Sequence, residues 1–276
     1  MAPRWRWRAD KLGKRLWSRV CRNLYRDAER DPGRSILIAG TARSGTTWLA
    51  DVIASQAPSR VLFEPFHRDK VEELGGLEYF QYLRPDDEHE VLERFCRRLF
   101  TGAIRHPWID REVRRLRPRV RVIKEIRANL FLRWIHQRFP AVRMLLVLRH
   151  PCAVVASRLS LGWATDDDLD PFLDQPALGA EIPLETVRRI RNSGTDAEKH
   201  AAIWCVSYLV PLRQFADARI PCVFYEDLVA RPEHVLPAVF EAVALRYEDS
   251  VFERLHVPST TSAAHSAVIR GDAGLG

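Results

Sequence analysis

The chain has 276 residues, of which 46% are hydrophobic, and it carries a net charge of +7 at pH 7. This length and apolar content predict one large core, and so one domain with additions rather than two equal domains. No apolar run approaches the ~18 residues that a membrane span needs, and the basic start lacks the apolar core of a secretory signal.

Residues 1–34 are a basic segment ahead of the first apolar strand. They hold eleven Arg or Lys residues against four acids, so the excess of seven equals the net charge of the whole chain. Apolar residues recur every four positions at Leu12, Leu16, Val20 and Leu24. With Trp17 beside them, this spacing predicts a basic amphipathic helix.

Two interpretations of this N-terminal arm stay open. Residues 1–30 bind an anionic membrane surface, or the apolar stripe packs on the domain while the arginines are solvated. No nucleic-acid-binding module or interleaved aromatic pattern accompanies the arm, so we expect no nucleic-acid partner.

A phosphate-binding loop is predicted after the first strand. An apolar run predicts a strand near 35–41, and helical spacing follows near 46–56. Between them, Gly40–Thr47 reads Gly-Thr-Ala-Arg-Ser-Gly-Thr-Thr, a loop whose backbone N–H groups and helix dipole favour an anion. A nucleotide triphosphatase needs a lysine where Thr46 stands. Because Arg43 supplies the cation instead, the loop fits an oxyanion other than a magnesium-bound triphosphate.

The remaining pattern alternates strands with helices. Strands are expected near 60–64, 119–126, 143–149 and 221–226, and helices near 88–103, 129–138, 152–161, 196–217 and 233–244. This predicts an α/β fold, a P-loop-like three-layer αβα arrangement around a mainly parallel sheet. Ligands of such sheets bind beyond the carboxyl ends of the strands, where Arg43, Glu64, Lys124, Arg149 and Tyr225 would fall.

The strand near 143–149 ends in a second candidate anion site. A triphosphatase would place a magnesium-binding aspartate there, whereas this strand ends in Arg149. Pro151 then opens a helix whose N-terminus also favours an anion. Arg149 and Ser157 therefore make a plausible second phosphate site, and we expect no metal ion.

An acidic stretch runs from Asp166 to Glu185. It contains seven acids and no Lys or Arg, and Pro171, Pro176 and Pro183 are expected to break regular structure. We expect residues 165–185 to form a loop over the mouth of the pocket. This loop gates or selects the acceptor, or is simply solvated.

Two further motifs complete a pattern with the two phosphate sites. They are Phe63-Glu64-Pro65-Phe66, and Phe224-Tyr225-Glu226-Asp227-Leu228 followed by Pro232. With Arg43-Ser44-Gly45-Thr46-Thr47-Trp48 and the pair Arg149 and Ser157, they resemble the sulfotransferases that use 3′-phosphoadenosine 5′-phosphosulfate (PAPS), especially the carbohydrate and bacterial branch. The resemblance spans roughly residues 35 to 245 of one domain.

The resemblance implies where PAPS binds. Residues Arg43 to Trp48 would hold the 5′-phosphosulfate, Arg149 and Ser157 the 3′-phosphate, and Tyr225 and Arg270 would add contacts. The sulfotransferase domain would cover residues 35–276, and the last helix usual in the family is expected to be missing. Trp48 stacks on the adenine or belongs to the core.

Catalytic roles follow on the same basis. The acceptor is expected to be a hydroxyl of a carbohydrate, a glycolipid or another secondary metabolite. Arg43 would stabilise the departing phosphate, and Glu64, which emerges at the same sheet edge, would be the general base; the alternative is a structural glutamate paired with an arginine. Lys124 and Arg127 either add positive charge near the sulfate or form a solvated strand end.

Other classes and the cellular compartment complete the expectations. A P-loop kinase or nucleotidase is the rival enzyme, and a non-catalytic nucleotide- or membrane-binding protein is the third possibility. Five widely spaced cysteines without a Cys-x-x-Cys pair predict a reduced, cytoplasmic protein, peripheral at the inner membrane surface if the arm binds lipid. His67, His136, His200 and His265 lack partner spacing and are expected to be structural.

Overall fold

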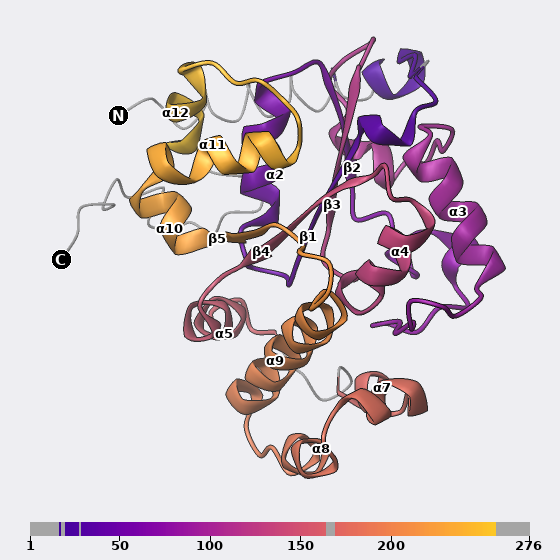
Figure 1. Ribbon diagram of the computed structural model, residues 1–276, viewed down its shortest axis with the longest axis vertical. Coiled ribbons are helices and arrows are strands. Elements are labelled where there is room, and N and C mark those ends of the chain that lie inside the picture. Colours follow the sequence, from indigo (N-terminus) through magenta and orange to yellow (C-terminus); the bar gives the residue numbers. More distant parts are fainter. Residues whose placement is uncertain (1–16, 18–19, 28, 164–168, 258–276) are drawn as a thin grey trace.

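The computed structural model describes residues 17, 20–27, 29–163 and 169–257. Within them lies a five-stranded sheet in the order β2-β3-β1-β4-β5, whose neighbouring strands are all parallel (Figure 1). The strands are β1 (Ser35–Gly40), β2 (Ser59–Phe63), β3 (Val120–Glu125), β4 (Arg143–Leu148) and β5 (Cys222–Phe224). All five lie where the apolar runs predicted them.

The longer helices were also predicted. They are α2 (Thr46–Ser55), α3 (Glu90–Phe100), α4 (Leu132–Arg138), α5 (Pro151–Leu159), α9 (Asp196–Gln214) and α11 (Pro232–Ala242). Of the remaining helices, η4 (Asn129–Phe131) lies within the helix expected near 129–138. The others were not predicted: η1 (Pro32–Arg34), η2 (Glu72–Leu74), η3 (Ile109–Glu112), α6 (Asp170–Leu173), α7 (Pro176–Glu181), α8 (Leu184–Arg191), α10 (Tyr225–Ala230) and α12 (Ser250–Leu255). Helices this short contain too few periodic positions to stand out from loops.

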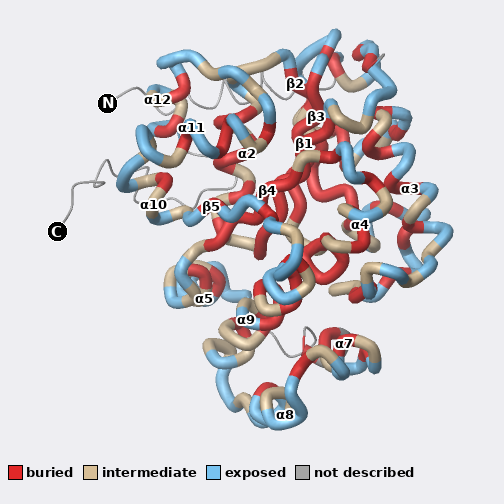
Figure 2. The backbone as a smooth tube through the Cα atoms, viewed as in Figure 1, coloured by how far each residue is buried: buried red, intermediate tan, exposed pale blue. Residues whose placement is uncertain are grey.

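Strand side chains alternate between two helical layers, which confirms the predicted αβα class. Ile36 and Ile38 of β1 join an apolar cluster with α2, α10, α11 and α12 on one face. Leu37 and Ala39 join a second cluster with α3, α4 and α9 on the other. Because both faces are covered, the central strands β1 and β4 are mainly apolar and buried (Figure 2). No described helix is long and apolar enough to cross a membrane.

The acidic stretch is helical rather than irregular in its described part. Pro176 stands in the first turn of α7 and Pro183 immediately precedes α8, positions at which proline begins a helix instead of breaking one. Phe172, Leu178 and Ile182 are buried in a third cluster with residues of α9. The expectation of irregular structure was therefore wrong here, because burial of these side chains stabilises short helices. Residues 164–168 lie outside the described residues.

The N-terminal arm faces the domain with residues other than those predicted. Residues 20–24 are helical, and Cys21 and Tyr25 pack with Val113. Val20 and Leu24 are exposed. The packing interpretation of this stripe was therefore wrong at both positions, whereas Leu12 and Leu16 lie outside the described residues.

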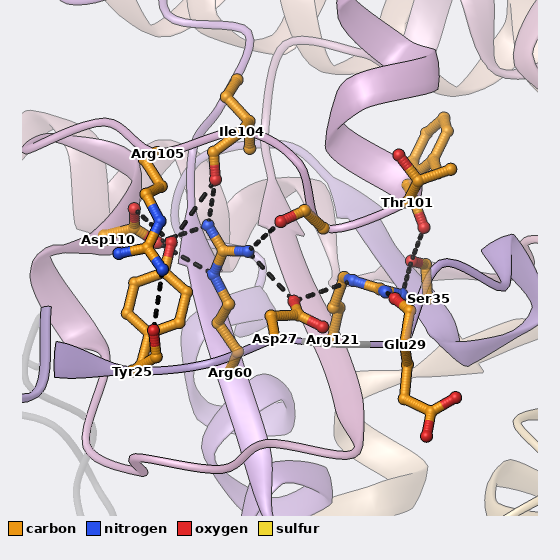
Figure 3. Close-up of polar contacts among 12 residues, drawn as sticks. Tyr25, Asp27, Glu29, Ser35, Arg60, Thr101, Ile104, Arg105, Asp110 and Arg121 are labelled. Atoms are coloured by element: carbon orange, nitrogen blue, oxygen red, sulfur yellow. Dashed lines mark hydrogen bonds and ion pairs between the residues drawn. The ribbon is translucent and has the colours of Figure 1, made fainter.

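A buried ionic network joins the arm to the N-terminal edge of the sheet (Figure 3). Arg60 on β2 pairs with Asp27 at 3.0 Å and with Asp110 at 2.9 Å, and Arg121 on β3 pairs with the same Asp27 at 3.0 Å. Arg60 and Arg121 are neighbours in the parallel register, and the guanidinium of Arg60 lies 4.4 Å from the centre of the Tyr25 ring. Asp27 and Asp110 thus balance the charges of the two buried arginines, and Asp27 holds the arm in place.

We expect Asp27→Ala to be strongly destabilising, because it leaves two buried guanidinium groups short of their shared partner. Breaking a buried ion pair on one side costs ~3–5 kcal/mol of unfolding free energy, which urea denaturation measures. Asp217→Ala is the matched control, since that exposed carboxylate pairs with Arg133 at the surface and should matter little. Equal losses in the two variants would contradict the role of Asp27.

Candidate active site

The predicted phosphate loop is a tight turn between β1 and α2. Gly45 precedes α2 with φ of 94°, and Arg43 is also left-handed, with φ of 74°. The hydroxyl of Ser44 donates to the carbonyl of Thr41 at 2.7 Å and closes the loop. A side chain on Gly40 would lie 2.7 Å from the carbonyl oxygen of Val147, so β1 and β4 approach closely only with glycine there. Loops of this kind form a concavity of N–H groups that favours an anion.

The second predicted phosphate site lies against the first. Arg149 donates through Nη1 to the carbonyl of Arg43 at 3.0 Å, and Nε of Arg43 donates to the hydroxyl of Ser157 at 3.0 Å. The guanidinium of Arg149 also lies 4.6 Å from the centre of the Tyr225 ring. Burial, followed by the neighbouring charge of Arg149, lowers the pKa of Arg43. Two cations beside two helix N-termini favour a ligand with more than one negative charge.

Tyr225 is in contact with the loop, whereas Trp48 is buried in the core beside it. A side chain on Gly45 would lie 2.5 Å from the Tyr225 ring, so this position also requires glycine. Trp48 is 6% exposed, meets Tyr225 edge-on at 5.5 Å, and donates its indole N–H to the carbonyl of Leu255. Of the two options for Trp48, this burial supports the core over adenine stacking. Thr46 is buried and Thr47 half-buried at the start of α2, and Arg270 lies outside the described residues.

Glu64 directly follows β2 and is held by two cations. One carboxylate oxygen accepts from Lys124, and the other accepts from Nη1 of Arg127 at 2.8 Å. Burial alone would raise the pKa of Glu64, but the charges of Lys124 and then Arg127 outweigh it, and the pKa lies below its ordinary value. Lys124 is itself buried, so the option of a solvated strand end is wrong for this residue.

A second glutamate, which no sequence pattern indicated, orders this corner. Glu125 is fully buried, and its carboxylate accepts backbone N–H groups of Phe66 at 2.8 Å and of Ile126 and Arg127 at 2.7 and 2.9 Å. These bonds fix the chain after β2 to the end of β3. They place Arg127 beside Glu64.

A cavity of about 420 Å³ lies between the loop and this corner. Its walls are Thr41, Ala42, Tyr79, Phe80, Ile126, Arg127, Arg158, Trp163, His200, Ile203 and Ser207. Arg127 therefore touches both the cavity and Glu64, and the loop residues Thr41 and Ala42 line the same cavity. The volume and the mixture of apolar and polar walls suit a small molecule.

Helix α9 positions both phosphate sites, which sequence reasoning missed. The hydroxyl of Tyr208 donates to the carbonyl of Val147 at 2.7 Å and accepts from the N–H of Thr41 at 3.2 Å. One turn earlier, the indole of Trp204 donates to the carbonyl of Arg149 at 3.0 Å. The only signal was two aromatic residues four apart on a predicted helix, which is equally typical of core packing.

Arg158 and His200 were also missed. Arg158 is buried, lines the cavity and donates to the carbonyl of Ala42 at 3.3 Å. His200, expected to be structural, lines the same cavity with Nε2 3.1 Å from the carbonyl oxygen of Trp163. The described residues contain no group of His, Cys, Asp or Glu arranged to hold a metal ion.

A family model described as the sulfotransferase family matches residues 35–249. The chain belongs to this family. The prediction drawn from the four motifs is thus confirmed, and the protein is a transferase by family. Curated protein sequences contain no match to this sulfotransferase.

The chain is also similar to several solved structures of sulfotransferases. One from Mycobacterium tuberculosis is 15% identical, with 88% of this chain and 76% of that chain covered and a TM-score of 0.46. One from Mycobacterium avium is 14% identical, with 83% and 68% covered and a TM-score of 0.45. A sulfotransferase domain from the curacin biosynthetic pathway is 15% identical, with 84% and 81% covered and a TM-score of 0.42.

We expect Glu64→Gln to lower the unfolding free energy by ~3 kcal/mol at pH 7, because Lys124 stays buried without a counter-charge. The folded pKa of Glu64 lies below the ordinary value of 4.5. Its stabilisation is therefore complete above about pH 4.5 and is lost as the pH falls through the folded pKa. Urea unfolding at pH 7, 5, 4 and 3.5 should show the difference from wild type shrinking only in the acidic range.

Glu78→Gln is the control for this pH series. Glu78 is an exposed carboxylate 4.0 Å from Arg68, so its loss should change stability little at any pH. A difference between wild type and Glu64→Gln that stays constant down to pH 3.5 would assign the effect to packing rather than to charge.

Proposed function

We propose that this sulfotransferase moves a sulfuryl group from PAPS to a hydroxyl of a small acceptor. The observation that carries the proposal is the meeting of Arg43 and Arg149, which precede α2 and α5, with Ser157 in the later part of α5. PAPS has a 5′-phosphosulfate and a separate 3′-phosphate, so it needs two anion sites within one nucleotide length. Loop Gly40–Thr47 suits the first group, and Arg149 with Ser157 suits the second.

The rival kinase or nucleotidase fits this arrangement less well. Such an enzyme would hold magnesium with an aspartate at the end of β4, where Arg149 follows instead. A non-catalytic nucleotide- or membrane-binding protein would need no carboxylate near the pocket. Glu64 contacts Arg127, which lines the cavity, and this supports an enzyme.

In the proposed reaction, the acceptor oxygen attacks sulfur in line with the bond to the departing phosphate. As the new S–O bond forms, the S–O bond to the phosphate breaks and adenosine 3′,5′-bisphosphate leaves. Arg43 and the loop N–H groups stabilise the charge that grows on that phosphate. Glu64, which is ionised at neutral pH because its pKa lies below the ordinary value, takes the proton of the acceptor hydroxyl.

The cavity walls narrow the class of acceptor. Tyr79, Phe80 and Trp163 present aromatic surface, while Arg127 and Arg158 present cationic groups. Aromatic rings stack on the flat face of a sugar or on an aromatic metabolite. A carbohydrate, a glycolipid headgroup or another secondary metabolite with a hydroxyl is therefore the acceptor we propose. We also propose a cytoplasmic location, which suits five cysteines that are all free.

Arg149→Ala should weaken the binding of adenosine 3′,5′-bisphosphate by roughly 30- to 100-fold, because a charge-assisted contact to a dianion is worth ~2–3 kcal/mol. Isothermal titration calorimetry measures this affinity. Arg189→Ala on α8, an exposed arginine, is the control with the same loss of charge and should bind normally. An Arg149 variant with wild-type affinity would remove Arg149 from the nucleotide site.

Glu64→Gln should reduce turnover by ~10²–10⁴-fold, the usual contribution of a general base, while bisphosphate affinity stays nearly unchanged. The assay is transfer of ³⁵S from labelled PAPS to a panel of sugar and phenolic hydroxyl compounds. Glu64→Asp, which keeps the carboxylate, should recover part of the rate. A folded Gln variant within threefold of the wild-type rate would leave Glu64 with a structural role only.

A further inference from the structure

A surface that is both apolar and basic lies on the arm. Residue 17 and residues 20–24 are helical, Val20 and Leu24 lie one turn apart on one face, and Trp17, Val20 and Leu24 are 49%, 44% and 63% exposed. Cys21 and Tyr25 follow Val20 and Leu24 by one position each, about 100° further round the helix, and are buried. The orientation of the helix is therefore fixed, with its apolar stripe turned away from the domain.

A second basic segment runs beside this helix. The indole of Trp17 donates to the carbonyl of Arg114 at 3.1 Å, and the N–H of Arg26 donates to the carbonyl of Leu116 at 2.7 Å. Leu116 is itself 39% exposed, and its neighbour Arg117 is exposed. Helix and segment thus form one continuous surface, although they lie about ninety residues apart in the chain.

The charges of this surface are largely uncompensated. Glu112 pairs with Arg114 at 3.1 Å. Arg26, Arg115 and Arg117 are exposed and make no ion pair with any residue that the structure describes. We call the set the docking patch: Trp17, Val20, Leu24, Arg26, Arg114, Arg115, Leu116 and Arg117.

The docking patch is preformed. Two residues after Tyr25 the chain enters the buried network, in which Asp27 pairs with Arg60 and Arg121 (Figure 3). Rigid anchoring of this kind means that the apolar and basic side chains are already displayed together before any partner binds. A helix that faced only water would not be expected to expose Trp, Val and Leu side chains.

We propose that the docking patch binds the surface of an anionic phospholipid bilayer. Trp and Leu side chains gain free energy by entering the boundary between headgroups and acyl chains, and arginines beside them attract the negative headgroups. A nucleic acid would satisfy the arginines but leave Val20, Leu24 and Leu116 in water. The combination of exposed apolar area and charge therefore favours a lipid surface.

The position of the docking patch sets the orientation on the membrane. The helix of residues 20–24 lies at the end of the sheet opposite α5 and α9 (Figure 1). Strands of six residues separate the two edges by roughly 20 Å. A bound bilayer therefore leaves the phosphate loop and the cavity open to solution, and membrane binding does not depend on the proposed function.

The test uses the full chain and vesicles of phosphatidylcholine with 30% phosphatidylglycerol, compared with phosphatidylcholine alone, in a flotation assay. We expect binding to the anionic vesicles that weakens as salt increases. Arg115→Glu with Arg117→Glu should lower the partition coefficient by roughly tenfold or more. Leu24→Gln should lower it by roughly threefold or more.

Matched controls come from α8 at the far end of the molecule. Arg188→Glu with Arg189→Glu changes the net charge equally, and Leu184→Gln replaces an equally exposed leucine. Both should bind vesicles within twofold of wild type, and urea unfolding should show every variant folded. Absence of anionic-vesicle binding, equal losses in the α8 controls, or normal binding by the docking-patch variants would overturn the proposal. So would short duplex DNA that displaces the vesicles and binds independently of Leu24.

Discussion

The structure is organised around two arginines brought together at the carboxyl edge of a parallel sheet. Arg149 donates to the backbone of Arg43 and lies close enough to help lower its pKa. Like charges in such proximity are unfavourable until an anion neutralises them. The loop glycines, the two helix starts and Tyr225 all serve this arrangement, because each brings a donor or a cation to the same point.

Helix α9 holds this arrangement rigid from outside the loops. Tyr208 ties the ends of β1 and β4 together through Thr41 and Val147, and Trp204 holds the carbonyl of Arg149. The same helix contributes His200, Ile203 and Ser207 to the cavity. One element thus sets the spacing of the anion sites and shapes the space beside them, and a shift of α9 would alter both.

The two edges of the sheet use buried charge differently. At the amino edge, Asp27 pairs with Arg60 and Arg121, and these ion pairs anchor the arm. None of these three residues lines the cavity. At the carboxyl edge, Glu64 is held by Lys124 and Arg127, and Arg127 also faces the cavity. The first network stabilises the fold, and the second keeps a carboxylate ionised next to a residue that lines the cavity.

The strands, the main helices and the phosphate loop were predictable, because apolar runs, helical spacing and glycine turns are local signals. The partners of Glu64 were not, since Lys124 lies 60 residues away in the chain and only the β2-β3 pairing brings them together. The hydrogen bonds of Tyr208 to Thr41 and Val147 were not predictable either, because they also depend on tertiary packing. The arm shows the same limit: its four-residue repeat was visible, but Cys21 and Tyr25, not Val20 and Leu24, are the residues that meet the domain.

The central claim is that the two arginine sites together bind a nucleotide with a separate 3′-phosphate. The most direct measurement is calorimetric comparison of adenosine 3′,5′-bisphosphate, in the presence of EDTA, with ATP and magnesium. The account predicts that the bisphosphate binds at least tenfold more tightly than ATP and without a divalent ion. Tighter binding of magnesium ATP, with no measurable affinity for the bisphosphate, would contradict it.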